Sequence, residues 1–412
     1  MPGNSPESVR ALKVAQNILG YRGLIAFLTL LSAFPAMSTD LYLPALPAMT
    51  HYFQASEYQI NLSLTLFFIF FALSSLIWGP LSDQYGRKRI LLAGMALYTG
   101  GAILCVLSLS NLQLVLCRCL QAAGGGAATT IATAIVKDEF QAKRRETILA
   151  MVQSMVVLAP AVAPVIGALL LRFTSWRGIF VTQAVFGVAL FAGALVFTET
   201  LEDTATNSGS VAQTMGRLVT VLRNPRFTAL LIMLSLLNIG SMAFISGSSY
   251  IYQNFYGLST QMFSFYFALN ALVMMAGPLV YLRLAARFTR YRIVTSGFGV
   301  FIVSGLLVSL LHGLGPWIFA LALLPASLAF IGLRPPGTYL MLNQQTADSG
   351  SAASLITSMA MISGSIGVTL ISFGMDNPAL AVGMIDLSLG VLCGGAWLCL
   401  THSRFLRSIR DT

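Results

Sequence analysis

Two charged residues lie inside long apolar stretches of this 412-residue chain: Asp40 near the end of residues 23–46, and Arg118 near the start of residues 112–136. A carboxylate in lipid costs about 2.5–3.5 kcal/mol on insertion scales unless it faces a cavity or a partner. Asp40 therefore has a reason to be there. A buried carboxyl group that alternates between its charged and neutral forms can carry a proton.

The two charges are predicted to lie at a similar depth. Each lies about six residues from the same side of its stretch, which is ~9 Å at 1.5 Å per residue of helix. That depth permits Asp40 and Arg118 to pair directly or through water. Each residue also has a structural interpretation. Asp40 can be a helix-end aspartate where the chain turns at Pro44 and Pro47, and Arg118 can hold helices together through backbone carbonyls.

A second group of charges lies in the loop "GPLSDQYGRKRI", from Gly79 to Ile90. Its cations alone are explained if they hold the loop in the cytoplasm. A cytoplasmic anchor does not explain the spacing of Gly79, Asp83 and Gly86. Glycine lets helices approach closely, and Asp83 offers a carboxylate to a helix N-terminus or an arginine. Holding the loop in the cytoplasm therefore explains the cations of this loop but not its glycines and its aspartate.

Two further charges lie inside apolar stretches of the second half. Arg334 lies within residues 317–341 beside two prolines, and Asp386 lies within residues 380–401. They are either a second ion or substrate site or a salt-bridged structural pair. The sequence leaves both possibilities open.

The chain that positions these charges has the composition of a membrane protein. It is 56% hydrophobic and 9% charged, whereas soluble domains carry about 25% charged residues. A stretch of about 20 apolar residues crosses a ~30 Å hydrocarbon core as a helix, which satisfies its own backbone. The sequence predicts an all-α protein with twelve transmembrane helices. Their residues are 23–46, 58–80, 88–108, 112–136, 146–171, 177–198, 227–250, 262–285, 292–313, 317–341, 350–373 and 380–401.

A polar segment, residues 199–226, follows the sixth predicted span and precedes the seventh. It divides the chain into two six-helix bundles. The predicted parts are an N-terminal segment 1–22, a bundle 23–198, the linker 199–226, a bundle 227–401 and a tail 402–412.

The net charge of +10 is distributed along the loops. Nearly all of the 24 Lys and Arg residues fall on one side of the predicted membrane if the N-terminus is cytoplasmic, and only Arg172 and Arg177 fall in an outer loop. This distribution marks the cytoplasmic side, places both termini there, and argues against nucleic acid as a partner. The five cysteines lie in predicted spans without metal-ligand spacing. With no nucleotide loop or nucleophile triad either, we expect neither an enzyme nor a bound metal.

The pattern G-P-L-S-D-x-x-G-R-K resembles the signature loop of the major facilitator superfamily. The resemblance covers nearly the whole chain and narrows to drug/proton antiporters of the bicyclomycin and chloramphenicol resistance (Bcr/CflA) type. The stretches that carry it are "STDLYLPALPAM", "RCLQAAGGGAA", "LAPAVAPVIGALL" followed by "SWRGIF", and "ISGSSYIYQNFYGLSTQMFSFYFALNA".

The resemblance implies two pseudo-symmetric bundles around a central cavity, in a monomer of the bacterial inner membrane. It also implies export of small amphipathic compounds in exchange for protons, with the proton gradient as energy source and no cofactor. Asp40 would be the coupling acid, and Arg118 with Gln121 would belong to the proton relay. The loop would act as a latch, with Asp83 against the start of span 11, near "DSGSAAS". Residue Arg87 would lie against Asp138.

The resemblance also assigns an antiporter motif to Pro160, Pro164 and Gly167, although any kinked packing helix would carry similar residues. The candidate cavity residues are Tyr42, Phe67, Gln121, Tyr250 and Asn270. The aromatic ones among them have an alternative role, facing lipid or filling space between helices.

A rival function uses the same fold. The protein would then be a proton-coupled transporter of one specific polar metabolite. Arg334 and Asp386 would favour that function if they line the cavity.

Overall fold

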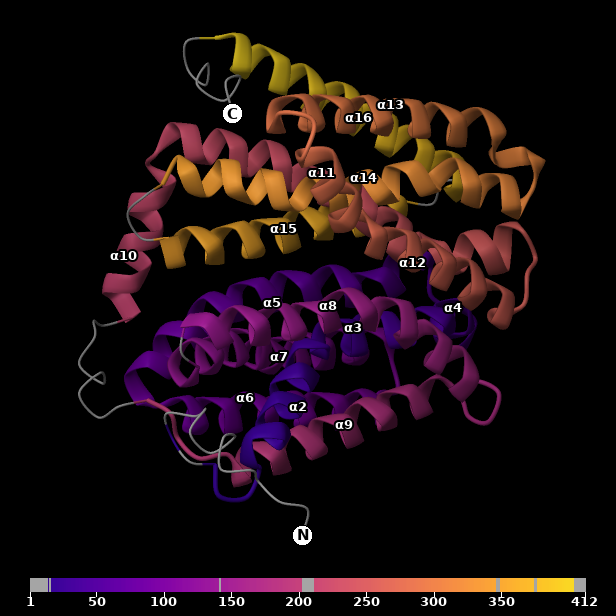
Figure 1. Ribbon diagram of the computed structural model, residues 1–412. Coiled ribbons are helices and arrows are strands. Elements are labelled where there is room, and N and C mark those ends of the chain that lie inside the picture. Colours follow the sequence, from indigo (N-terminus) through magenta and orange to yellow (C-terminus); the bar gives the residue numbers. More distant parts are fainter. Residues whose placement is uncertain are drawn as a thin grey trace. The chain divides into compact units, whose positions relative to one another are not determined.

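The computed structural model describes residues 14, 16–140, 142–201, 211–345, 349–373 and 376–403, and these residues form helices and loops without a strand (Figure 1). Contacts between residues group the chain into two compact units. The first is Met1–Tyr42 with Leu66–Met215, and the second is Leu43–Thr65 with Gly216–Thr412. The domain boundaries expected from the sequence stay a prediction.

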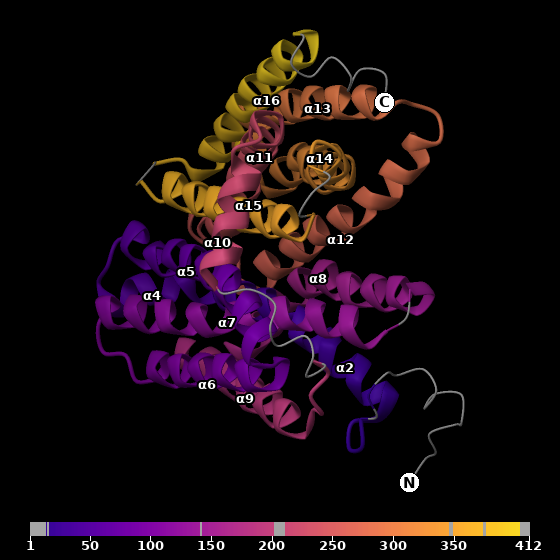
Figure 2. The same cartoon turned by 90° about the vertical axis from the view of Figure 1, so that its left-hand side faces the viewer.

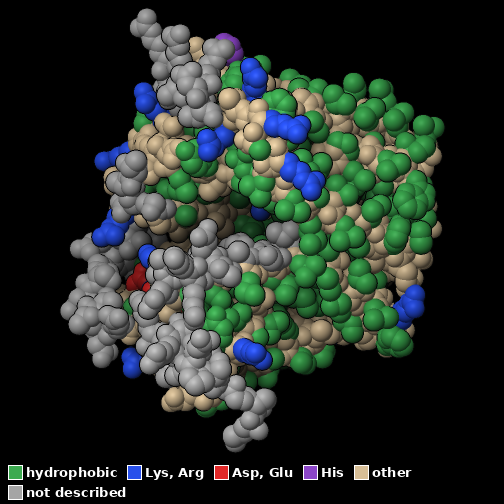
Figure 3. Space-filling model, viewed as in Figure 1, with side chains coloured by type: hydrophobic (Ala, Val, Ile, Leu, Met, Phe, Trp, Pro, Cys, Tyr) green, Lys and Arg blue, Asp and Glu red, His purple; other side chains and the backbone are tan. Residues whose placement is uncertain are grey.

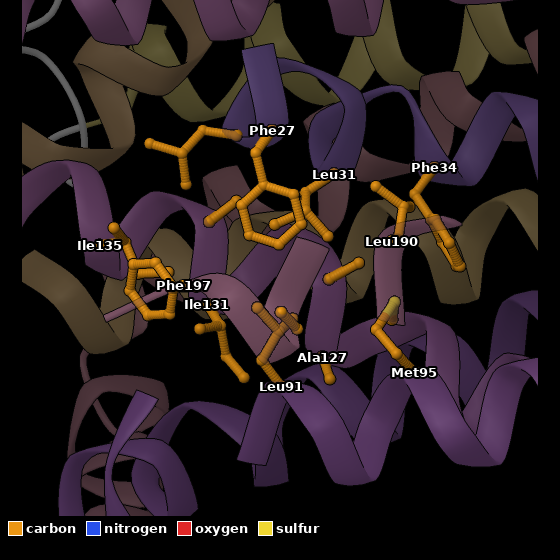
Figure 4. Packing of buried hydrophobic residues seen from close by; sticks show 14 of the residues in the cluster. Phe27, Leu31, Phe34, Leu91, Met95, Ala127, Ile131, Ile135, Leu190 and Phe197 are labelled. Carbon is orange, nitrogen blue, oxygen red and sulfur yellow. The ribbon is translucent and has the colours of Figure 1, made fainter. Parts of the chain in front are cut away.

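The first unit is a helical bundle with an extensive hydrophobic core. Its helices are α2 (Gly20–Ser32), α3 (Phe34–Thr39), most of α5 (Glu57–Tyr85), α6 (Arg87–Val106), α7 (Asn111–Glu139), α8 (Ala142–Leu170) and α9 (Trp176–Val196). Figure 4 shows the core, to which α2, α3, α6, α7 and α9 contribute side chains. A Cβ atom on Gly124 of α7 would lie 2.3 Å from the backbone N of Tyr98, so only glycine lets α6 and α7 approach this closely.

The first predicted span is a broken helix, where the sequence predicted a regular one over residues 23–46. The chain bends by 50° between Gly20–Ser32 and Phe34–Phe53. Pro35 lies in the first turn of α3 and lacks a backbone N–H. Further along, the 3-10 helix η1 (Asp40–Ala45) contains Pro44, and α4 (Leu46–Phe53) follows it. The prolines therefore place Asp40 at the start of a tight turn.

The second unit contains the remaining long helices. These are α11 (Pro225–Ser249), which continues as the π-helical turn η3 (Tyr250–Phe255), α12 (Thr260–Ala285), α13 (Arg290–Leu311), α14 (Pro316–Asn343), α15 (Ser349–Ile371) and α16 (Pro378–His402). The boundary between the two units falls within α10 (Val211–Leu222). A Cβ atom on Gly367 would lie 2.0 Å from the carbonyl oxygen of Ile239. Helices α11 and α15 therefore pack so closely that this position has no room for a side chain.

Residues 43–65 join the second unit through polar contacts. Asn61 Nδ2 donates to Ser372 Oγ at 2.7 Å, and Gln253 Nε2 donates to the carbonyl oxygen of Pro44 at 3.2 Å. These contacts tie η1 to η3, and the start of α5 to the end of α15.

Among the described residues, ten helices are long and apolar enough to cross a membrane, and the bent pair of the first span would make an eleventh. Helix α8 contributes a shorter apolar segment, Leu158–Leu170. The predicted all-helical membrane fold is confirmed, whereas the count of twelve spans is not. Figure 3 shows a surface covered largely by hydrophobic side chains, as lipid requires.

Candidate functional site

Arg118 is fully buried inside the first unit, on α7. Its guanidinium carbon Cζ lies 4.0 Å from the ring centroid of Phe67 and 4.8 Å from that of Tyr42. A cation over an aromatic face gains about 2 kcal/mol or more when it is desolvated. The two rings therefore form a pocket that stabilises a positive charge without neutralising it.

The guanidinium group uses only part of its hydrogen-bonding capacity. Arg118 Nη1 donates to the Ser38 carbonyl oxygen at 3.0 Å and to Gln121 Oε1 at 2.6 Å. Its Nε and Nη2 atoms are buried and have no hydrogen-bond partner among the described residues. A buried arginine with unused N–H donors can bind a carboxylate or another hydrogen-bond acceptor without breaking its existing hydrogen bonds.

Asp40 is buried at the first position of η1, with 6% of its surface exposed. Thr39 Oγ1 donates to Asp40 Oδ1 at 2.9 Å. Within the described part of the chain, Asp40 and Arg118 form no ion pair. Arg118 instead contacts the carbonyl of Ser38, because α3 ends at Thr39 and the last carbonyls of a helix lack partners within it. This contact is the one expected of an arginine that holds helices together.

Two polar residues of this cluster were not predicted. Gln183 Nε2, on α9, donates to the Ser38 carbonyl oxygen at 3.1 Å, and Gln183 Oε1 accepts from Gln121 Nε2 at 2.9 Å. Tyr98 OH lies 3.0 Å from Ser38 Oγ. Gln183 has a signal in the sequence, since it is the only amide side chain in the apolar stretch 177–198. Tyr98 has none.

The signature loop is held by Arg87. Arg87 forms an ion pair with Asp83, one turn before it, and its Nε lies 2.8 Å from Asp138 Oδ2 at the end of α7. Its Nη1 also donates to Ser82 Oγ at 2.7 Å. The contact with Asp138 is the one implied by the family resemblance. The other implied contact, of Asp83 with the start of span 11, involves residues 346–348, which lie outside the described residues, so it stays a prediction.

Glu199 contacts the signature loop, and the sequence analysis did not predict this contact. Its carboxylate accepts from the backbone N of Arg87 at 3.0 Å and of Lys88 at 2.9 Å, and so neutralises the positive end of α6. Gly86 has φ +98°, and a Cβ there would lie 2.7 Å from Glu199 Oε2. Glycine is needed for both reasons. No signal predicts this contact, which joins residues 112 positions apart.

Small residues bring the neighbouring helices close. A Cβ on Gly79 would lie 3.3 Å from Thr130 Cγ2 on α7, which is a tight contact. On α8, Ala159 packs against Ala33 and Ala36 beside the break in the first span.

The antiporter motif lies on a continuous helix. Pro160 and Pro164 are both inside α8, and Gly167 is buried. Helix α8, which carries this motif, packs against α3, the helix that leads to Asp40.

The remaining candidate cavity residues are also buried. Tyr250 begins the π-helical turn η3, and Asn270 Nδ2 donates to Ser327 Oγ at 2.8 Å. Tyr42, Phe67 and Tyr250 are each at most 2% exposed, so the lipid-facing alternative for them is wrong.

Asp386 and Arg334 do not form the salt-bridged pair considered from the sequence. Asp386 is 3% exposed and lines a small cavity with Gly240 and Ser327. Arg334 is exposed, its Nη2 donates to Asn238 Oδ1 at 3.1 Å, and its Cζ lies 4.8 Å from the Phe330 ring centroid. Neither Asp386 nor Arg334 forms an ion pair with another described residue. Arg334 has an amide and an aromatic ring as its partners instead.

Comparison with known proteins identifies the family of this chain. The sequence pattern of the Major Facilitator Superfamily matches residues 27–368. The chain belongs to the major facilitator superfamily. It is 30% identical to an uncharacterized MFS-type transporter, YdgK of Bacillus subtilis, over 92% of this chain and 96% of the relative. It is 26% identical to the bicyclomycin resistance protein homolog of Haemophilus influenzae, over 86% of this chain and 90% of that protein.

Membership confirms the resemblance found in the sequence and makes the protein a multi-pass transporter of small molecules, not an enzyme. The structure of the nucleoside transporter NupG superimposes with a TM-score of 0.75 at 13% identity, and covers 92% of this chain and 99% of that one. At this identity the likeness shows the major facilitator fold alone.

Proposed function

We propose that this transporter exports small amphipathic compounds in exchange for protons by alternating access. The observation that carries the proposal is the buried carboxyl of Asp40, two residues from the carbonyl that binds the buried Arg118. The 26% identity to a bicyclomycin resistance protein homolog supports a drug as the exported compound.

In this mechanism Asp40 alternates between two states. Protonated, it is neutral and needs only the hydrogen bond from Thr39. Deprotonated, it carries a charge that costs free energy in a buried site unless a cation compensates it. The unused Nε and Nη2 donors of Arg118 provide that compensation after a small shift of the Ser38–Asp40 segment. Proton release is thereby linked to movement of the first span.

A susceptibility panel tests the function. Cells that overexpress the transporter should resist several chemically unrelated amphipathic compounds, and an uncoupler should abolish the resistance. Resistance that persists with the uncoupler would contradict proton coupling. A phenotype with a single compound would favour the rival function.

That rival, transport of one specific polar metabolite, is favoured by Arg334. An exposed guanidinium in the middle of α14 suits a ligand with a carboxylate or phosphate group. Loss of transport in Arg334→Gln for an anionic metabolite only would support this second function.

We further propose twelve spans, with α8 and the bent first span included, in one monomer of the bacterial inner membrane. The bundles are residues 23–198 and 227–401, and both termini with the linker are cytoplasmic. The distribution of cations along the loops supports this orientation.

Reporter fusions test the orientation. Reporter enzymes fused after Thr412 and within residues 204–216 should both report a cytoplasmic location, because cations are concentrated in the loops on that side. A fusion after Phe173, beside Arg172 and Arg177, should report the opposite side and serves as control. A periplasmic signal at Thr412 or within 204–216 would overturn the orientation.

We also propose that the loop around Arg87 is a gate on the cytoplasmic side. Asp83 keeps 48% of its side chain exposed, so its ion pair with Arg87 contributes at most about 1 kcal/mol to stability. A contact that stabilises the fold this little is suited to form and break during a transport cycle.

The gate predicts the behaviour of Asp83→Asn. The variant should express and fold, because Asp138 still holds Arg87, but it should transport poorly. The accessibility of introduced cysteines to a water-soluble reagent should shift toward an inward-open state. Arg89→Gln, an exposed change in the same loop, is the matched control. Normal transport with unchanged accessibility in Asp83→Asn would leave the loop as a charge anchor only.

A further inference from the structure

A cavity of about 560 Å³ lies within the second unit, among α12, α13 and α14. Helix α14 packs against both of the others, whereas α12 and α13 contact each other much less. Figure 2 shows α12 and α13 diverging on two sides of α14. The cavity is therefore a groove with α14 as its floor, and its volume falls in the ~300–1,000 Å³ range of small-molecule sites.

The groove is long and apolar. Its lining on α13 extends from Tyr291 to Val300, which is about 14 Å of helix at 1.5 Å per residue. The floor includes Leu328, Ala329 and Leu333. These walls offer hydrophobic contact along a line, which suits an extended hydrocarbon chain.

One end of the groove is strongly basic. Arg292 lines it, and Arg283 and Arg287 are exposed where α12 leads into α13. Arg290 differs, since its Cζ lies 4.1 Å from the Tyr339 ring centroid. In the described part of the chain, none of the other three arginines forms an ion pair.

No acidic residue lies near these arginines in sequence. The chain contains no Asp or Glu between Asp203 and Asp348, a segment that includes all of α10 to α14. The positive field at the groove end therefore has no carboxylate from its own helices to neutralise it. Such a field attracts anions and repels an amphipathic cation.

We propose that this groove binds an anionic diacyl phospholipid, with one acyl chain along α12 to α14 and the phosphate at Arg287 and Arg292. Guanidinium groups bind phosphate oxygens with two parallel hydrogen bonds, and basic pockets between membrane helices bind anionic head groups. The site is separate from the Asp40 and Arg118 cluster, which belongs to the first unit. It therefore does not depend on what the transporter exports.

Native mass spectrometry of the delipidated, detergent-solubilised transporter tests this proposal. The probes are dioleoyl phosphatidylglycerol and dioleoyl phosphatidylethanolamine, which share their acyl chains and differ in net charge. We expect preferential retention of phosphatidylglycerol. The Arg287→Ala/Arg292→Ala variant should bind it about 30-fold more weakly, since each cation near an anionic lipid contributes ~1 kcal/mol. Phosphatidylethanolamine has the same phosphate but no net charge, so its weaker binding should fall by a smaller factor.

Three further variants separate head-group binding from acyl-chain binding. Arg217→Ala/Arg223→Ala, on the exposed surface in and just after α10, is the matched control and should leave phosphatidylglycerol binding unchanged. Ala329→Phe should fill the floor and weaken both lipids. Val300→Trp fills the groove from its exposed wall, and can replace Ala329→Phe if that variant does not fold.

Several results would overturn the proposal. One is equal retention of the two lipids, and another is undiminished phosphatidylglycerol binding in the Arg287/Arg292 variant. A third is displacement of phosphatidylglycerol by millimolar inorganic phosphate, which would identify an anion site without an acyl-chain groove.

Discussion

Asp40→Asn should abolish proton-driven export while substrate binding and exchange remain. Asparagine has nearly the same shape and accepts the hydrogen bond from Thr39, but it cannot be charged. The carrier is then fixed in a neutral state. In cells, resistance should fall to that of a strain without the transporter, whereas purified carrier in vesicles should still exchange labelled substrate between its two sides.

The same variant should lose the pH dependence of substrate binding. In the parent, a neutral or cationic substrate displaces the proton of Asp40, so protons and substrate compete. Binding therefore weakens as pH falls, by about tenfold per pH unit where the carboxyl is mostly protonated. Asp40→Asn has no proton to displace, so its affinity should be flat with pH.

Proton release measures this directly. Substrate added to the detergent-solubilised parent in a weakly buffered solution should release protons, and Asp40→Asn should release none. Asp386→Asn, which neutralises a buried carboxyl of the second unit, is the matched control and should release protons as the parent does. Undiminished release from Asp40→Asn would remove Asp40 from the mechanism and make Asp386 the next candidate.

Arg118→Ala should also abolish transport. The change removes hydrogen bonds to the Ser38 carbonyl and to Gln121 and leaves an empty space between Phe67 and Tyr42. Each buried acceptor left without a donor costs about 1–3 kcal/mol. We therefore expect a lower melting temperature together with complete loss of export, measured by thermal unfolding and by substrate efflux from energised vesicles.

Arg118→Lys separates charge from shape. Lysine keeps a positive charge near Asp40 but lacks the planar group that lies over Phe67 and reaches Ser38 and Gln121 together. If the charge serves proton coupling, Arg118→Lys should keep part of the export and all of its pH dependence.

Arg177 provides a matched control for a purely structural arginine. It donates to the carbonyl oxygens of Val106 at 3.1 Å and Ser108 at 3.0 Å, and its Cζ lies 4.4 Å from the Trp176 ring centroid. These are the same kinds of contact that Arg118 makes. Arg177→Ala should lower stability and preserve coupling. Equal effects of the two alanine variants on transport, at matched stability, would show that Arg118 only holds helices together.

Much of the fold was readable from composition alone. In lipid a backbone must satisfy its own hydrogen bonds, so a long apolar stretch has one regular solution, the helix. One contact of the signature loop could also be predicted from the sequence. The family pattern pointed to Asp138 as the partner of Arg87, and an ion pair at 2.8 Å joins the two residues. The ion pair of Arg87 with Asp83 was not predicted.

Contacts between helices that are distant in sequence could not be predicted and come from the three-dimensional structure. Glu199 reaches the start of α6 across 112 positions, and Gln183 meets Ser38 across 145. The groove among α12, α13 and α14 likewise exists because two helices diverge around a third. Helix formation depends on neighbouring residues, which the sequence shows. Which faces meet depends on how side chains of several helices fill space together. Because α3 ends at Thr39, the Ser38 carbonyl, rather than the Asp40 carboxylate, is the partner of Arg118.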